Sequence, residues 1–203
     1  RKWTLKDISF WNQFGITLTV LEQYNVEPVS HIFINDKILK CDEHTYCFIE
    51  NKDGIQTYKI YQPFNKKYKW LNNHNSSVWQ GWTQLPEKGD YLIITKSLKD
   101  VMSIKCVTGV NAVSLQTESA KPKEQIIEEL QSRFTNIYIL YDNDYDKEEN
   151  WGRNFGLAMS NCFNTKQLEI HERYKSKDFS DFVKNKGEVD AYNWLFLQLD
   201  VPF

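Results

Sequence analysis

Asp142 and Asp144 stand two residues apart after an apolar run at residues 137–141. Side chains two residues apart on an extended chain point to the same side, so both carboxylates can face one point. Like charges this close repel each other unless a cation neutralises them. Mg²⁺ and Mn²⁺ prefer such oxygen ligands, completed by water and substrate phosphates. The pair predicts either a site for Mg²⁺ or Mn²⁺ or a solvated acidic turn, where Asp and Asn are also common.

Further acids follow two other apolar runs. Asp100 comes one turn after the run at residues 91–95, and Asp178 and Asp181 come shortly after residues 167–170. Asp178 alone fits a helix N-cap, a position where Asp is common. Acids after three separate runs favour the metal site over the acidic turn. The candidate metal ligands are Asp100, Asp142, Asp144, Asp178 and Asp181.

The second half of the chain alternates apolar strands with helical patterns, and these elements must position the acids. We expect strands at residues 91–95, 111–115, 137–141 and 167–170, and helices from residue 98, at 122–134, at 151–162 and at 179–199. This alternation implies right-handed crossovers and a parallel sheet with both faces covered. Sites in such sheets form at the carboxyl ends of the strands, where the acids stand.

The first ninety residues have a different pattern. Short aromatic and β-branched runs at residues 31–34, 45–49 and 57–61 predict antiparallel hairpins, and the turn signal Asn51-Lys52-Asp53-Gly54 lies between the last two. Residues 4–24 are expected to be helical or mixed. The predicted fold class is therefore α/β, with a smaller β-rich α+β subdomain at residues 1–90 and a parallel sheet flanked by helices at residues 91–203.

The segment from residue 54 to 86 contains no Asp or Glu. Lysines neutralise phosphates, and aromatic rings stack on unpaired bases. The composition fits a track for single-stranded nucleic acid; it also fits a β-region with a ring-filled core and solvated lysines. The lysines and rings of this segment are Lys59, Lys66, Lys67, Lys69, Tyr58, Tyr61, Phe64, Tyr68, Trp70, Trp79 and Trp82.

From about residue 91 to 185 the sequence resembles the Toprim fold of bacterial and phage primases, topoisomerases and related nucleases. In the segment before it, Lys59 and Lys69-Trp70-Leu71-Asn72 resemble, more loosely, the subdomain that precedes Toprim in bacterial-type primases. The Toprim resemblance is carried by Leu92-Ile93-Ile94-Thr95 leading to Asp100, the strand segment at residues 109–115, Ile139-Leu140-Tyr141-Asp142-Asn143-Asp144, Gly152-Arg153 and Lys177-Asp178.

The resemblance implies the RNA-polymerase core of a DNA primase, of phage type, that synthesises short RNA primers on single-stranded DNA from ribonucleoside triphosphates. It implies that Asp142 and Asp144, with Asp100 or Asp178, hold divalent ions for nucleotidyl transfer. Lys59, Lys69 and Arg153 are implied to bind template or triphosphate, and Lys66 and Lys67 belong to the expected nucleic-acid track. A replicative helicase is a candidate partner, since the sequence has no phosphate-loop motif of its own.

The sequence departs from the family at one functional position. Where the family has a Glu that binds metal or acts as acid or base, this chain has Lys96, followed by Ser97 in place of Gly. We expect Lys96 to compete with the cation, to contact phosphate directly, and to leave metal binding weak without nucleotide. Asp146, Glu148 and Glu149, in an insertion at residues 145–150, are candidate replacement ligands.

Two alternatives remain open at this stage. A Toprim nuclease would use the same metals to hydrolyse phosphodiesters. A catalytically silent Toprim module would bind nucleic acid inside a replication complex, and Lys96 favours that interpretation.

The composition excludes some classes of protein and predicts a cellular location. A formal net charge of −2 excludes a basic nucleic-acid coat, and no apolar run approaches the roughly 20 residues of a membrane span. Four scattered cysteines and the absence of a signal peptide predict a reduced, cytoplasmic protein (host cytoplasm if of phage origin), and the N-terminus without Met suggests a fragment. Cys41-x2-His44-x2-Cys47 would need a fourth ligand, such as His31, to form a zinc site; buried thiols beside a strand are the favoured interpretation.

Overall fold

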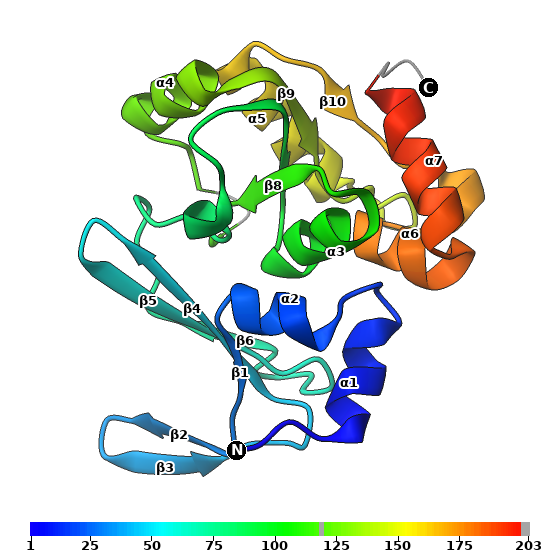
Figure 1. Cartoon of the computed structure of the whole chain (residues 1–203). Helices are drawn as coiled ribbons and strands as arrows, with labels where there is room; N and C mark the ends of the chain where they lie inside the picture. The colour runs from blue at the N-terminus through cyan, green and yellow to red at the C-terminus, as the bar shows by residue number, and fades with distance from the viewer. Residues whose placement is uncertain (118–119, 200–203) are drawn as a thin grey trace.

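The computed structural model describes residues 1–117 and 120–199. Its first part pairs two short helices with a four-stranded antiparallel sheet in the order β1-β4-β5-β6 (Figure 1). The expected hairpin is present, and its turn places Asp53 and Gly54 at positive φ angles of 51° and 77°. The bounds in this part are α1 (Leu5–Asn12), α2 (Leu18–Gln23), β1 (Val26–Pro28), β4 (Tyr46–Lys52), β5 (Ile55–Tyr61) and β6 (Trp70–Asn72).

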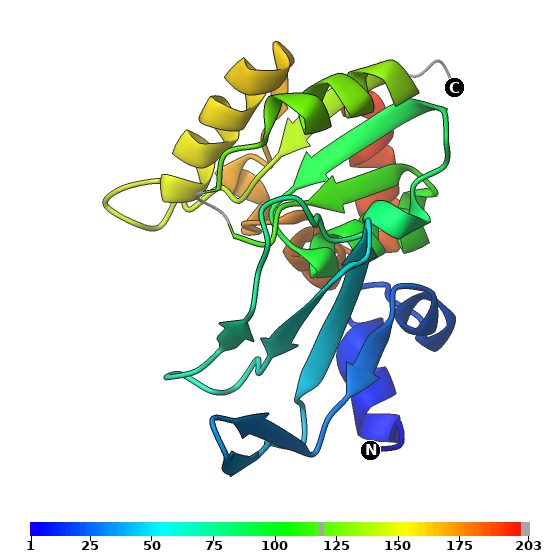
Figure 2. The same ribbon diagram turned by 90° about the vertical axis from the view of Figure 1, so that its left-hand side faces the viewer.

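The run at residues 31–34 forms a strand, but this strand does not join the four-stranded sheet. β2 (His31–Ile34) pairs only with β3 (Lys37–Lys40) among the described strands. Figures 1 and 2 show this hairpin at the end of the molecule away from the parallel sheet. Its apolar side chains gain little burial there, since Phe33 remains 73% exposed.

The second part is a four-stranded parallel sheet in the order β10-β9-β7-β8. Helices α3, α6 and α7 pack on one face and α4 and α5 on the other, which confirms the predicted α/β fold class. The bounds are β7 (Gly89–Thr95), α3 (Leu98–Thr108), β8 (Asn111–Ser114), α4 (Glu124–Arg133), β9 (Phe134–Leu140), α5 (Trp151–Phe163), β10 (Gln167–Leu168), α6 (Phe179–Lys186) and α7 (Glu188–Gln198), with short 3₁₀ turns η1 (Trp82–Gln84) and η2 (Glu172–Tyr174).

Several boundaries differ from the sequence-based expectation by a few residues, and two of the differences have a clear cause. Phe134, expected at the end of a helix, takes an extended conformation, begins β9 and buries its ring against the neighbouring strand start at Gly89. β10 ends at Leu168 instead of Ile170, because the carbonyl of Ile170 accepts a hydrogen bond from the Asn143 side chain and leaves the sheet. Both differences arise from long-range contacts that local sequence patterns do not contain.

The two parts share one apolar core. Rings of the first part, such as Trp11 and Tyr46, belong to the same buried cluster as Val101 on α3 and Phe182 on α6. The backbone of Gln80 also exchanges hydrogen bonds of 2.8 and 3.0 Å with Ser114 on β8. None of the described helices combines the length and apolarity that a membrane span requires.

Candidate active site

Three carboxylates meet at the carboxyl end of the parallel sheet. Asp100 lies in the first turn of α3, Asp142 comes two residues after the end of β9, and Asp178 caps the N-terminus of α6. One oxygen of each lies within 4.8 Å of one oxygen of the others, and within residues 1–117 and 120–199 no other trio of potential metal ligands does so. We call these three residues the acidic cluster. The structure thus brings together acids from three strand ends, as the sequence predicted.

Hydrogen bonds from serine residues and from the backbone hold two members of the acidic cluster in place. Ser97 caps α3 and donates its hydroxyl to Asp100 Oδ2 at 2.6 Å, while the backbone N–H of Ser180 donates to Asp100 Oδ1 at 3.1 Å. Asp178 Oδ1 accepts from the Ser180 hydroxyl and from the Asp181 backbone N–H, both at 2.7 Å. The capping interactions of α3 and α6 therefore also orient the carboxylates of the acidic cluster.

A glycine lets α5 approach the third member. A Cβ atom at Gly152 would lie 2.4 Å from the carbonyl oxygen of Asp142 and 2.7 Å from its Cβ. No side chain fits at that distance, so only glycine allows the helix to begin here without moving Asp142. The glycine of the sequence pair Gly152-Arg153 is therefore explained by this close approach, whereas Arg153 pairs with Glu169 at 2.9 Å.

Two lysines contact the acidic cluster. Lys96 Nζ lies 2.6 Å from Asp142 Oδ2. Lys99 Nζ lies 3.6 Å from Asp178 Oδ2 and 3.7 Å from Asp181 Oδ1, and it sits 4.5 Å from the centre of the Phe14 ring. Sequence reasoning identified Lys96 and missed Lys99. The spacing Ser97-x-x-Asp100, a capping pattern, was the available signal for the first turn that carries Lys99.

The electrostatics of the acidic cluster favour a bound cation. Burial, reinforced by the neighbouring Asp178, raises the pKa of Asp142 to about 8, and burial with the same neighbour raises the pKa of Asp100 to about 7. Burial also opposes ionisation of Asp178, but Lys99 and the Ser180 hydrogen bond outweigh it and lower its pKa. Crowded carboxylates of this kind ionise fully when a divalent ion joins them. The donor set, all carboxylate oxygens, fits Mg²⁺ or Mn²⁺.

Asp144 lies outside the acidic cluster, although the sequence pattern suggested that it would face the same point as Asp142. β9 ends at Leu140, so the alternation of the strand does not extend to residue 144, and the Asp144 backbone N–H donates to Asn150 Oδ1 at 2.8 Å. Asp144 instead pairs with Lys147 at 2.8 Å and lies 3.8 Å from Lys177. Burial disfavours its charge, but the hydrogen bond and charge of Lys147 lower its pKa overall. A metal contact by Asp144 stays a prediction.

The acidic cluster opens into a cavity of about 130 Å³ between the two parts of the molecule. Lys69 and Trp70 of the acid-free segment form its opposite wall, together with Tyr61, whose ring stacks on Trp70 at 4.4 Å. Lys96 and Lys99 also line it. Partial desolvation and the nearby Lys99 lower the pKa of Lys69. The basic, aromatic segment and the acidic cluster therefore face one another across this space.

The remaining lysines of the acid-free segment lie in different environments. Lys66 and Lys67 are exposed in the loop before β6. Lys59 is only 9% exposed; its ammonium donates to the Gln116 carbonyl at 2.7 Å and lies 4.7 Å from the centre of the Trp70 ring. Burial lowers the pKa of Lys59 to about 8. A phosphate contact by Lys59 stays a prediction, and in this structure the side chain is used inside the protein.

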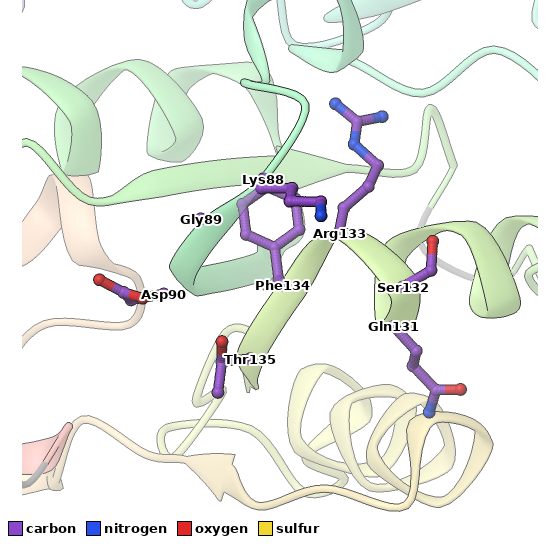
Figure 3. Close-up of a pocket in the computed structure, with 8 residues that line it drawn as sticks. All are labelled: Lys88, Gly89, Asp90, Gln131, Ser132, Arg133, Phe134 and Thr135. Carbon is purple, nitrogen blue, oxygen red and sulfur yellow. The ribbon is translucent and has the colours of Figure 1, made fainter.

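Another hollow lies at the opposite end of the parallel sheet, where β7 and β9 begin (Figure 3). Arg133 lines it, but its guanidinium donates to the carbonyls of Leu85 and Pro86.

The residues considered as zinc ligands have other surroundings. His44 pairs with the Tyr46 hydroxyl at 3.1 Å, and Cys47 is buried. The acidic cluster is therefore the place in the described chain where ligand chemistry and access coincide.

No family model and no curated protein sequence matches the chain. Solved structures match it closely in fold. A DnaG catalytic core superimposes with a TM-score of 0.70 and 11% identity over 96% of this chain and 72% of that chain. A DnaG primase catalytic domain bound to single-stranded DNA gives 0.66 and 13% over 94% and 72%. A bacteriophage T7 structure, with primase domains bound to an RNA/DNA hybrid and dTTP, gives 0.58 and 12% over 92% and 87%. The chain has the fold of primase catalytic cores, as the Toprim resemblance predicted.

Proposed function

We propose that this chain is the RNA-polymerase core of a DNA primase, which synthesises short RNA primers on single-stranded DNA by divalent-metal-dependent nucleotidyl transfer. The observation that carries the proposal is the acidic cluster at the sheet edge, facing Lys69 and Trp70 within a fold shared with primase cores. In this proposal residues 1–90 form the template-binding subdomain and residues 91–203 form the Toprim domain. Such a protein would act in the cytoplasm beside a replicative helicase.

The metal fits the residues present. Asp100, Asp142 and Asp178 would hold Mg²⁺ or Mn²⁺. Two further candidate ligands are Asp144 and Asp181, and the latter contacts Lys99. When bound, a divalent ion would lower the pKa of the primer 3′-hydroxyl and neutralise charge on the phosphates. Ser97 and Ser180 orient the carboxylates, and Lys99 fixes Asp178 by charge.

The template and nucleotide would approach from the acid-free segment. Lys66 and Lys67 are exposed, and beside them Phe64 and Tyr68 are 66% and 50% exposed, as stacking on unpaired bases requires. Lys69 leads from this loop into the cavity of the acidic cluster. Two of the similar structures hold single-stranded DNA or an RNA/DNA hybrid with a nucleotide, and these are the ligand classes that we propose for this chain. Arg153 is proposed as a further phosphate contact from α5.

A primer-synthesis assay tests the proposal. The protein is incubated with single-stranded DNA, labelled ribonucleotides and Mn²⁺ or Mg²⁺, and short RNA products are resolved on a gel. We expect metal-dependent RNA synthesis that Asp142→Asn abolishes and that Asp146→Asn, on the exposed insertion, retains. Strand cleavage without synthesis would identify a nuclease instead. Binding of single-stranded DNA with neither reaction would identify a silent module.

A further inference from the structure

The two acids after β9 are each paired with a lysine. Lys96 contacts Asp142 at 2.6 Å, and Lys147 contacts Asp144 at 2.8 Å. An ion bridging these two aspartates would have to compete with both ammonium groups. Of the two acids, only Asp142 also belongs to the acidic cluster, where Asp100 and Asp178 offer oxygen ligands of their own. The ion pairs therefore favour an ion position at the acidic cluster over a position that bridges Asp142 and Asp144.

The charge balance points the same way. Three carboxylates, those of Asp100, Asp142 and Asp178, and three ammonium groups, those of Lys69, Lys96 and Lys99, line the cavity. Asp181 lies beside it, 3.7 Å from Lys99. With all of these groups ionised, four negative and three positive charges leave a net charge of −1. One divalent ion brings the total to +1, and a second would raise it to +3 before any phosphate enters. Uncompensated charge in a partly buried site is costly.

The side chain of Lys96 is more exposed than that of Lys99. Lys99 is held between two carboxylates over the Phe14 ring, and its side chain is 14% exposed. Lys96 contacts Asp142, lines the cavity and has a side chain that is 26% exposed. A lysine side chain has a flexible four-carbon stem, so its ammonium can exchange one anionic oxygen for another within the cavity. Lys96 is thus placed to pass from Asp142 to a phosphate that enters.

We propose that this site binds a single divalent ion, at the acidic cluster, and that the ammonium of Lys96 supplies the positive charge that a second ion would otherwise bring. The proposal rests on the proposed function. When a nucleoside triphosphate binds, Lys96 releases Asp142 to the ion and contacts a phosphate oxygen. Lys96 is then a phosphate-contacting residue, and the lysine at this position changes the number of ions the site takes.

Two binding measurements test the proposal without relying on catalysis. Electron paramagnetic resonance of Mn²⁺ titrated into the protein gives the number of ions per chain. We expect one ion in the wild type, a roughly tenfold tighter single ion in Lys96→Gln, and a second ion in Lys96→Glu, where a carboxylate replaces the ammonium. Lys166→Gln, an exposed lysine outside the cavity, is the matched control and should behave as the wild type.

Calorimetry with adenosine triphosphate in the presence of EDTA then measures the phosphate contact alone. Its affinity should fall about tenfold in Lys96→Gln and recover in Lys96→Arg.

The possible failures can be told apart. Two Mn²⁺ ions in the wild type, or metal-free triphosphate affinity unchanged in Lys96→Gln, would overturn the role of Lys96 and leave the proposed primase function standing. No Mn²⁺ binding in either the wild type or Lys96→Glu would overturn the metal-dependent function itself.

Discussion

The ammonium of Lys99 lies 3.6 Å from the carboxylate of Asp178 and is held there over the ring of Phe14. Asp178 caps α6, and Lys99 belongs to the first turn of α3, so this ion pair joins the starts of two helices that pack on the same face of the sheet. The surrounding carboxylates outweigh the effect of burial and raise the pKa of Lys99. The acidic cluster is thus built around a positive charge that two carboxylates and one ring hold in place.

Asp142 offers the most direct test of the metal centre. Asp142→Asn removes one charge and one strong ligand from the acidic cluster, so we expect Mn²⁺ affinity to fall by at least tenfold while the circular dichroism spectrum stays unchanged. Asp146→Asn is the control, because Asp146, a candidate replacement ligand from the sequence, lies outside the acidic cluster and pairs with Lys177. Calorimetry that shows equal Mn²⁺ affinity in Asp142→Asn and the wild type would remove Asp142 from the metal site.

Two glycines on α5 provide a matched pair. In Gly152→Ala the new Cβ meets backbone atoms of Asp142 that cannot move aside. In Gly156→Ala the closest atom is the end of the flexible Gln167 side chain, and Cβ of Tyr141 follows at 3.0 Å. We expect Gly152→Ala to lower the free energy of unfolding by about 1–3 kcal/mol and to weaken Mn²⁺ binding by shifting Asp142. Gly156→Ala should weaken Mn²⁺ binding less. Equal behaviour of the two variants in denaturant unfolding and Mn²⁺ titration would contradict the close-approach argument.

The sequence allowed much of the parallel sheet to be predicted, because the apolar runs and helical spacings are local. The meeting of Asp100, Asp142 and Asp178 also followed from topology, since parallel strands end at one edge. The position of Asp144 outside the cluster depends on the loop after β9, where it pairs with Lys147 and bonds Asn150, and the strand pattern does not contain these contacts. The burial of Lys59 could not be predicted from local sequence either, because its partner Gln116 lies 57 positions away in the chain.

The exposed lysines of the acid-free segment should contribute to binding of single-stranded DNA. Replacing Lys66, Lys67 and Lys69 by Ala should weaken binding and reduce the slope of log affinity against log salt by about 0.7 for each phosphate that the protein no longer neutralises. Fluorescence anisotropy with a labelled oligonucleotide at several salt concentrations gives that slope. Alanine at Lys166 and Lys186, which are exposed in the second part of the chain, serves as the control and should leave the slope unchanged. An unchanged slope in the triple variant would mean that these lysines are only a solvated surface.

Glu50 should make the stability of the protein depend on pH. Its carboxyl is 3% exposed and accepts a hydrogen bond from the Gly81 backbone N–H at 3.1 Å, and burial raises its pKa to about 8. The unfolded chain releases this proton near its ordinary pKa of about 4.3, so the folded state loses stability as the pH rises from there towards 8. Glu50→Gln keeps the acceptor and removes the titration.

We therefore expect Glu50→Gln to gain stability over the wild type between pH 5 and pH 8, by roughly 2–4 kcal/mol across that range. Urea unfolding at several pH values measures the difference. Glu22→Gln, at an exposed glutamate of α2, should show no such trend. A constant difference between Glu50→Gln and the wild type at all pH values would show that Glu50 is ionised in the fold.

The pair of Lys99 and Asp178 leads to the final prediction. Lys99→Gln leaves the carboxylates of Asp178 and Asp181 without the ammonium that balances them, and removing one partner of a buried pair costs about 3–5 kcal/mol. The metal-free variant should therefore unfold at a lower temperature than the wild type.

The same loss of positive charge should tighten Mn²⁺ binding. A ligand that binds only the folded state stabilises it more, at a given concentration, when its dissociation constant is lower. We expect saturating Mn²⁺ to raise the melting temperature of Lys99→Gln by more than that of the wild type, as followed by circular dichroism. Lys186→Gln is the control, since Lys186 is an exposed lysine in the last turn of α6. If Lys99→Gln were as stable as the wild type without metal, or gained no more from Mn²⁺, Lys99 would not be the charge around which the acidic cluster is built.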